Sequence, residues 1–144
     1  MFKTVRIPHL GGIEASYKIS GNYKQYKPTL IMINSFTTSA DLYEAQFSNT
    51  ELTEAMNLIA IEPLGHGKTK LRAGARVESE NQTFTYWDTA IMNVQVMDAI
   101  GVKSAFVLGT SQGGWITVRM ALIAPDKVCS QTFPLRCTQR QLSA

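Results

Sequence analysis

The sequence predicts an α/β domain in which an N-terminal antiparallel hairpin is followed by a mostly parallel sheet with flanking helices. Residues 2–7 and 13–19 alternate apolar and polar side chains, as strands with one buried face do. Residues 29–33, 58–61 and 105–108 are unbroken apolar runs, which are typical of strands buried on both faces. Helical patterns separate these runs, and the alternation of strand and helix favours a parallel sheet.

The first half of the chain carries the signals of a hairpin, two buried strands and a broken helix. Gly11 and Gly12 form the turn signal between the two alternating strands. The two apolar runs follow, and residues 39–56 lie between them. This segment carries spaced apolar side chains, and we expect it to form one broken helix or two short ones.

The second half carries two helix signals on either side of the last apolar run. Residues 85–100 predict a helix, because Thr85 and Asp88 resemble a capping box and Gly101 suits the position just after the C-terminus. Residues 115–124 are apolar nearly all round, so we expect this helix to be buried on most sides.

Length and composition describe one globular domain. The chain has 144 residues, of which 44% are hydrophobic, and its formal net charge is +3. Basic residues gather between positions 67 and 76, but no aromatic side chains interleave with them, so we expect a solvated loop and no nucleic-acid partner. The two cysteines, Cys129 and Cys137, fit no zinc template, so we expect reduced thiols and no metal. No motif calls for a cofactor.

The segment Gly109-Thr110-Ser111-Gln112-Gly113 fits the pattern G-x-S-x-G between an apolar strand and an apolar helix. Turning from strand to helix in so few residues places the serine in a strained backbone conformation. Side chains two positions on either side would clash, so glycine is needed there. The positive end of the following helix favours a developing oxyanion, and the backbone N–H of Gln112 points toward it.

Two further loops follow the earlier apolar runs: residues 34–39, Asn-Ser-Phe-Thr-Thr-Ser, and residues 62–69, Glu-Pro-Leu-Gly-His-Gly-Lys-Thr. We call residues 109–113 the serine elbow. The two loops and the serine elbow occur in the order found in the N-terminal half of an α/β-hydrolase, which residues 1–127 resemble. Asn34 and Ser35 stand where that family typically has His-Gly, and Glu62 and Leu64 replace Asp and Arg. The sequences of these motifs also resemble those of fungal α/β-hydrolases, including some from polyketide and toxin biosynthesis.

The resemblance implies a role for each matching residue. Ser111 would be the nucleophile, and the backbone N–H groups of Phe36 and Gln112 would form the oxyanion hole. Asn34 would brace the loop that presents Phe36, and His66 would have a structural role in its turn. The implied reaction is cleavage of a small ester, thioester or lactone through an acyl-serine intermediate, with no cofactor.

The partners that such a serine needs are not apparent in this sequence. In this fold the catalytic acid and histidine follow the serine along the chain. No histidine follows Ser111, and the one acidic residue after it is Asp126, which we expect at the surface, as we do His9 in the hairpin. We therefore expect a truncated form whose later strands are missing, with weak or no activity. The alternative is a non-catalytic fragment that binds a full-length hydrolase or another partner.

The remaining expectations concern the tail and the location of the chain. Residues 128–144 break the strand–helix pattern and predict a divergent, irregular tail. Without a further strand, residues 105–108 would form an unpaired apolar edge open to self-association. No apolar run approaches the roughly 18 residues of a membrane span. The N-terminus lacks the pattern of a signal peptide and the C-terminus that of a peroxisomal tripeptide, so we expect a cytoplasmic, intracellular protein.

Overall fold

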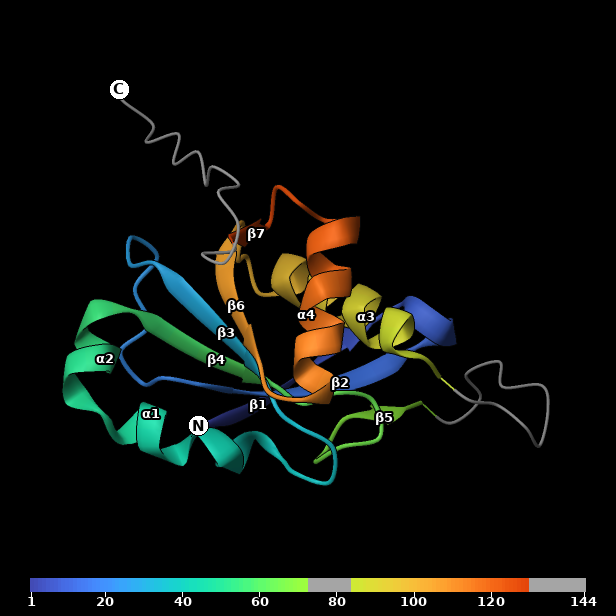
Figure 1. Ribbon diagram of the computed structural model, residues 1–144, viewed down its shortest axis with the longest axis horizontal. Helices are drawn as coiled ribbons and strands as arrows, with labels where there is room; N and C mark the ends of the chain where they lie inside the picture. The colour runs from blue at the N-terminus through green and yellow to red at the C-terminus, as the bar shows by residue number, and fades with distance from the viewer. Residues whose placement is uncertain (73–83, 130–144) are drawn as a thin grey trace.

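A single mixed sheet forms the centre of the chain in a computed structural model that describes residues 1–72 and 84–129 (Figure 1). Its strands are β1 (Phe2–Ile7), β2 (Ile13–Ile19), β3 (Thr29–Ile33), β4 (Asn57–Ile61), β5 (Lys70–Leu71), β6 (Ala105–Gly109) and β7 (Val128–Cys129). The helical segments are η1 (His9–Gly11), η2 (Ala40–Tyr43), α1 (Glu44–Ser48), α2 (Thr50–Ala55), α3 (Tyr86–Ala99) and α4 (Gln112–Ile123).

The strands lie in the order β1-β2-β4-β3-β6-β7, with β5 paired to β2. Strand β2 is antiparallel to β1, β4 and β5, whereas β3 runs parallel to both β4 and β6. The predicted hairpin followed by a mostly parallel sheet is therefore confirmed. In the parallel pair β3–β6, Ile33 lies opposite Gly109, so the loops that follow these two strands start at the same level of the sheet.

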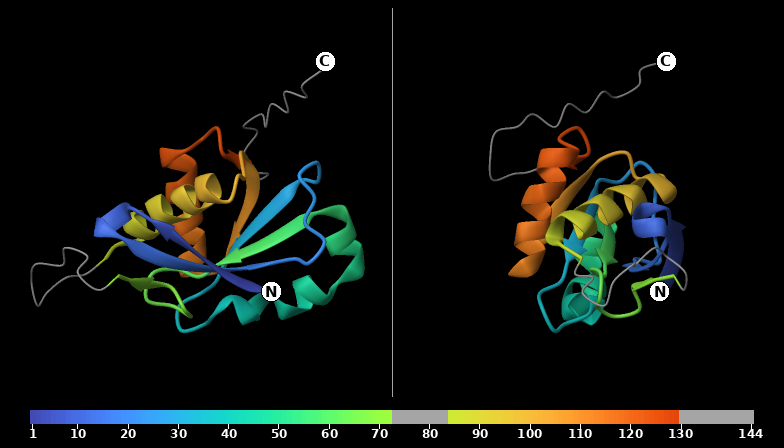
Figure 2. Two further views of the ribbon diagram at one scale, coloured as in Figure 1. Left: turned by 180° about the vertical axis from the view of Figure 1, so that it is seen from behind. Right: turned by 90° about the vertical axis from the view of Figure 1, so that its right-hand side faces the viewer.

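The central strands are buried on both faces, as the apolar runs predict. Ile31 and Ile33 of β3 pack into a core that includes residues of α3 and α4, whereas Met32 packs into a second core with Tyr43. Figures 1 and 2 show the corresponding layers: α3 and α4 cover one face of the sheet, and the segment from η2 to α2 covers the other. The alternation of β3 and β4 side chains between two cores makes this a three-layer α/β/α arrangement.

Helix α3 begins with the capping box that the sequence predicts. The Thr85 hydroxyl accepts a hydrogen bond from the Asp88 N–H at 3.3 Å, and the Asp88 carboxylate accepts one from the Thr85 N–H at 2.7 Å. At the other end, Gly101 has a φ of 77°, and Val102 N–H donates to the Met97 carbonyl. The left-handed conformation of Gly101 and this hydrogen bond together terminate α3, and glycine adopts that conformation without steric cost.

The segment between β3 and β4 is more fragmented than expected. It forms three short helical pieces, η2, α1 and α2, instead of one broken helix or two short ones. The interruption at Asn49 has a local cause, because its side chain accepts a hydrogen bond from Leu52 N–H and starts α2 as an N-cap.

The edge of the sheet beside β6 differs from expectation in two respects. Val128 and Cys129, in the segment predicted to be irregular, form the short strand β7, which pairs with Ala105 and Phe106. The edge of β6 is therefore covered over its first half. Leu108 is 48% exposed, so β6 is not buried on both faces as predicted. The η2–α2 layer packs on β3 and β4, and among the described residues nothing covers Leu108 on that face.

Helix α4 is also more exposed than its composition predicts. Ile116 and Met120 are fully buried against the sheet side, but Trp115 is 63% and Leu122 67% exposed. The expectation of burial on most sides was wrong because one side of α4 has no neighbouring layer within residues 1–72 and 84–129 (Figure 2).

No helix within residues 1–72 and 84–129 is both long enough and apolar enough to span a membrane. Cys129 is disulfide-bonded, so the expectation of reduced thiols was wrong for this residue. The spacing of the cysteines excluded a zinc template but contained no information on their redox state.

Candidate functional site

The segment around Ser111 forms the sharp strand-to-helix turn that the sequence predicts. Ser111 is an exposed residue directly before α4, with φ 54° and ψ −115°. A Cβ on Gly109 would lie 2.1 Å from the backbone of Gly113, and a Cβ on Gly113 would lie 2.1 Å from the Ile33 carbonyl oxygen. Both glycines are thus required by close backbone contacts, and not only by conformational freedom.

The carbonyl of Ile33 is the point at which the elbow is fastened to the end of β3. It accepts a hydrogen bond from the Thr110 N–H at 3.1 Å and another from the Tyr43 hydroxyl at 2.7 Å. The Tyr43 oxygen also lies 2.8 Å from the Thr110 hydroxyl, which donates to it because the tyrosine proton is used on Ile33. Burial raises the pKa of Tyr43, and the hydrogen bond from Thr110 partly opposes this.

Tyr43 is a site residue that sequence reasoning missed. It is 3% exposed and comes from η2, whereas the elbow it supports lies 67 residues further along the chain. Its position in the sequence looks like an ordinary apolar helix position. No local pattern distinguishes a core tyrosine from one whose hydroxyl holds a distant turn.

The loop after β3 is organised by the side chain of Asn34. Its Nδ2 donates to the carbonyls of Ser35 and Thr38, at 3.1 and 2.8 Å, and so closes the loop around Phe36. Asn34 is 1% exposed, and its Oδ1 has no hydrogen-bond partner among the described residues. The predicted bracing contacts of Asn34 are therefore present in the structure, whereas the purpose of the loop stays a prediction.

The loop after β4 is organised by the buried carboxylate of Glu62. Its oxygens accept hydrogen bonds from the Ala40 N–H at 3.2 Å and from the Lys68 N–H at 2.8 Å. Gly67 has a φ of 54°, and a Cβ there would lie 2.1 Å from the same carboxylate. Glu62, where the family typically has Asp, therefore joins the start of η2 to the turn that contains His66.

His66 connects all three loops. Its ring meets that of Phe36 edge-on, with the centroids 5.8 Å apart, and its Nε2 lies 3.1 Å from the side-chain nitrogen of Gln112. The structure therefore brings Phe36, His66 and Gln112 together beside Ser111, although they are far apart in the sequence. Their roles in binding or catalysis are proposals.

The hydrogen bonds of His66 indicate which ring nitrogen carries the proton. Its Nδ1 lies 3.0 Å from the carbonyl of Leu64, which can only accept, so Nδ1 carries a hydrogen. In a singly protonated ring Nε2 is then the acceptor for the Gln112 side-chain amide. Both ring nitrogens are thus occupied, and neither is bonded to Ser111.

The other histidine, His9, makes its side-chain contact with α3 and not with the serine elbow. Its Nε2 lies 3.0 Å from the Asp88 carboxylate, and its side chain is 17% exposed. His9 is therefore only partly exposed at the surface where we expected it, because η1 places it against the first turn of α3. Asp126 is exposed, as expected.

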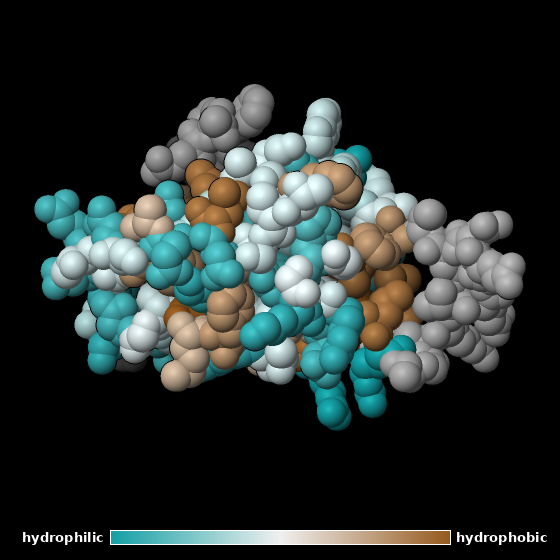
Figure 3. All heavy atoms as spheres, turned by 90° about the horizontal axis from the view of Figure 1, so that it is seen from below, coloured by the Kyte–Doolittle hydropathy of each residue, from teal (hydrophilic) through white to brown (hydrophobic). Residues whose placement is uncertain are grey.

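The face from which these loops emerge is chemically mixed. Figure 3 views the molecule from below and shows hydrophilic surface with separate hydrophobic patches instead of one continuous apolar area.

Within the described residues, the backbone N–H groups of Phe36 and Gln112 make no hydrogen bond in the structure. Two unused donors beside a serine at a helix N-terminus could stabilise a negatively charged oxygen.

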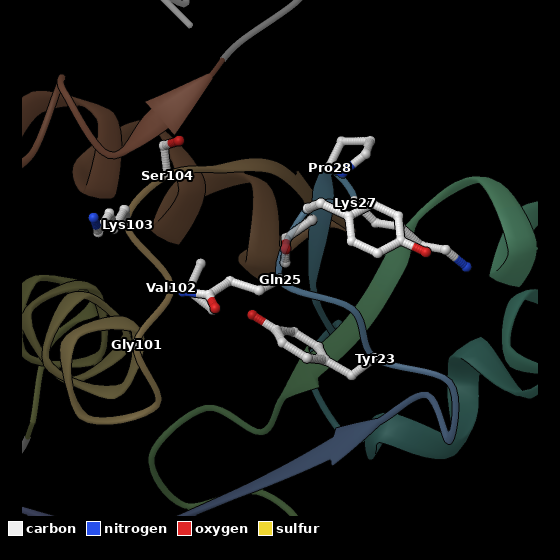
Figure 4. Close-up of a pocket in the computed structure, with 10 residues that line it drawn as sticks. Tyr23, Gln25, Lys27, Pro28, Gly101, Val102, Lys103 and Ser104 are labelled. Atoms are coloured by element: carbon white, nitrogen blue, oxygen red, sulfur yellow. The ribbon is translucent and has the colours of Figure 1, made fainter. Parts of the chain in front are cut away.

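A separate cavity of about 290 Å³ lies at the opposite ends of β3 and β6 (Figure 4). Its walls come from the β2–β3 and α3–β6 connections, with Tyr23 and Gln25 on one side and Val102 and Ser104 on the other. The Lys27 amine donates to the Thr53 carbonyl at 3.2 Å and points away from the cavity. The cavity is at the amino ends of these strands, whereas Ser111 follows the carboxyl end of β6, so the two are distinct.

The chain matches the profile of the family described as alpha/beta hydrolase fold over residues 28–133. It therefore belongs to the α/β-hydrolase fold family. Its architecture is the N-terminal part of that fold, with an antiparallel hairpin leading into the parallel strands.

Curated and solved proteins similar to this chain are considerably longer. It is 27% identical over 119 residues to a dihydrolipoyllysine-residue acetyltransferase component of an acetoin cleaving system from Cupriavidus necator, covering 83% of this chain and 28% of that protein. A probable hydrolytic enzyme from Pseudomonas aeruginosa is 19% identical with a TM-score of 0.73, over 89% of this chain and 39% of the other. The enol-lactonase from Burkholderia xenovorans is 20% identical with a TM-score of 0.69, over 86% and 44%.

Proposed function

We propose that Ser111 is the nucleophile of a serine-hydrolase site that cleaves an ester, thioester or lactone through an acyl-serine intermediate. The observation that carries this proposal is the backbone of Ser111, held at a φ of 54° directly before α4 by two glycines that no larger residue could replace. Strained residues of this kind persist where the surrounding structure over-determines them, and they cluster at functional sites.

The oxyanion hole of this site consists of the backbone N–H groups of Phe36 and Gln112. In the reaction the Ser111 oxygen attacks the carbonyl carbon, and the carbonyl oxygen takes up the negative charge between these donors. Asn34 holds the loop of Phe36, and His66 holds the side chain of Gln112. The substrate is a small ester, thioester or lactone, and the similarity in fold to an enol-lactonase supports this class.

The activity of this chain by itself is weak or absent. The serine needs a general base, and both histidines of the sequence are bonded elsewhere: His66 to Leu64 and Gln112, and His9 to Asp88. An acid and a histidine from polypeptide outside the described residues would complete the site. The resemblance to fungal enzymes of secondary metabolism supports a role in toxin or polyketide biosynthesis, and the cytoplasmic location stays a prediction.

Labelling with a fluorophosphonate probe tests the nucleophile. We expect slow labelling of the folded chain that disappears in Ser111→Ala and persists in Ser104→Ala, an exposed serine at the other end of β6. Labelling that is unaffected by Ser111→Ala, or a folded chain without any labelling, would count against a working nucleophile.

A second candidate function is that of a non-catalytic fragment that binds a full-length hydrolase or another partner. The exposed apolar side of α4 favours it, since such surfaces mark interaction sites. Co-purification with a complete hydrolase, together with no probe labelling, would support this alternative over the first.

A further inference from the structure

The last backbone hydrogen bond between β3 and β6 lies directly before the two loops that carry Phe36 and Gln112. In it, the Thr110 N–H donates to the Ile33 carbonyl at 3.1 Å. Beyond this point, no backbone hydrogen bond within the described residues joins the loop after β3 to the serine elbow. The spacing of the two loops therefore depends on this one hydrogen bond and on side-chain contacts.

Tyr43 links the two partners of this hydrogen bond a second time. Its hydroxyl donates to the Ile33 carbonyl at 2.7 Å and accepts from the Thr110 hydroxyl, whose oxygen is 2.8 Å away. The result is a chain of two hydroxyl groups that ends on a carbonyl oxygen, both of whose lone pairs are then occupied. In such a chain each hydrogen bond polarises the next and strengthens it.

The ring of Tyr43 is held firmly by its surroundings. It is 3% exposed and belongs to the second core with Met32 and Leu58, on the face of the sheet that the segment from η2 to α2 covers (Figure 1). At the start of η2, the Ala40 N–H donates to the Glu62 carboxylate at 3.2 Å. Burial raises the pKa of Tyr43, so its hydroxyl keeps its proton and donates throughout the neutral range.

We propose that Tyr43 is a positioning residue that sets the spacing of the two oxyanion donors, the N–H groups of Phe36 and Gln112, a role that rests on the proposed function. Phe36 lies three residues after Ile33, and Gln112 lies two residues after Thr110. A change at the shared hydrogen bonds therefore displaces the two donors relative to each other. An oxyanion hole acts only when its donors point at the same oxygen, so a small displacement slows acylation of the serine.

This role predicts an effect on the reaction step and none on binding, because Tyr43 is buried and acts through the backbone. Tyr43→Phe keeps the ring and its packing, and it leaves the Thr110 hydroxyl without its acceptor. Tyr17→Phe is the matched control. Tyr17 is also buried, at 7% exposure, but it belongs to the other core, and its hydroxyl makes no hydrogen bond to the described residues.

Amide resonances of the nitrogen-15-labelled chain test the spacing without any reaction. In Tyr43→Phe, we expect the Phe36 and Gln112 amide signals both to shift or broaden, and the Thr110 amide to exchange with solvent on the order of ten times faster. Tyr17→Phe should leave all three amides unchanged. Circular dichroism confirms that each variant is folded. Unchanged Phe36 and Gln112 signals in Tyr43→Phe would overturn the proposal.

Labelling with a fluorophosphonate probe at several concentrations separates the reaction step from binding. We expect Tyr43→Phe to lower the maximal labelling rate of Ser111 about tenfold and to leave the probe concentration for half-maximal rate within about twofold. Thr110→Val should have a similar effect, and Thr110→Ser, which keeps the hydroxyl, should restore the rate. The double variant Tyr43→Phe with Thr110→Val should be no slower than the slower single variant, because both changes break the same chain of hydrogen bonds.

The two measurements distinguish failure of the positioning role from failure of the proposed function. A folded parent chain without labelling would remove the nucleophile, while the amide signals would still decide whether Tyr43 sets the spacing. Labelling that requires Ser111 but is as fast in Tyr43→Phe as in the parent chain would overturn the positioning role alone. Equal slowing in Tyr17→Phe, or a change confined to the half-maximal concentration, would mean a general effect on structure or binding and would also overturn that role.

Discussion

Close backbone contacts, more than side-chain chemistry, determine which residues can flank Ser111. Gly109 and Gly113 are packed against backbone atoms, and the Ile33 carbonyl that crowds Gly113 also accepts hydrogen bonds from Thr110 and Tyr43. Because neither the carbonyl nor its donors can move without breaking these bonds, the elbow cannot relax around an added methyl group.

Gly113→Ala should therefore destabilise the protein strongly. We expect a loss of about 3 kcal/mol in the free energy of unfolding, since the new Cβ would overlap the Ile33 oxygen. Urea denaturation followed by circular dichroism measures it. Gly21→Ala is the control, because a Cβ there meets no heavy atom within 4 Å, and its stability should be unchanged or raised by up to about 1 kcal/mol. Equal effects of the two changes would contradict this account of the elbow.

At the scale of elements, α3 is attached to the hairpin through the same carboxylate that caps it. The Asp88 side chain accepts hydrogen bonds from the Thr85 N–H and hydroxyl and contacts His9 of η1. Burial opposes ionisation of Asp88, but these hydrogen bonds and the nearby His9 outweigh it, so that the pKa of Asp88 lies below its usual value. Ionised Asp88 thus stabilises the folded state.

The sign of this pKa shift gives a prediction for acid pH. A carboxyl group with a lowered folded-state pKa contributes stability that is present above its unfolded pKa of about 3.9 and is lost as the pH falls through the folded value. We expect Asp88→Asn to cost about 1 kcal/mol at pH 7, the typical value of a helix cap, and markedly less near pH 2. Urea midpoints at the two pH values measure this. Asp126→Asn, at an exposed position, should show no such pH-dependent difference.

At the scale of the whole molecule, stability is concentrated in the middle of the sheet. Strands β3 and β4 are each paired on both sides and packed by helices on both faces, whereas β5 and β7 are short strands of two residues each. Local opening should therefore begin at the latter two and involve β3 and β4 last.

Hydrogen exchange measured by mass spectrometry tests this gradient. Amides of β3 and β4 should exchange more slowly than those of β5 and β7 by a factor on the order of 1,000, since the former exchange only through global unfolding. Similar protection of β7 and β3 would mean that the sheet edge is held by contacts beyond the described residues.

The sequence by itself determined the elements of this protein. Apolar alternation, unbroken apolar runs and the Thr85–Asp88 capping box predicted the hairpin, the parallel strands and α3, because these signals arise from local backbone geometry and from burial on one or two faces. The glycines of G-x-S-x-G likewise predicted the elbow. Segments with weaker local signals were less predictable: a break between β3 and β4 was expected, but its division into three helical pieces and the short strand β7 were missed.

The tertiary structure alone decided which residues meet. The hydroxyl of Tyr43 reaches the elbow, His66 bridges Phe36 and Gln112, His9 binds Asp88, and the apolar stripe of α4 stays exposed. Each of these depends on the order of strands in the sheet and on which layer covers which face. Such contacts join residues tens of positions apart, and a periodic pattern records only that a side chain is apolar or polar, not which distant group it packs against or leaves uncovered.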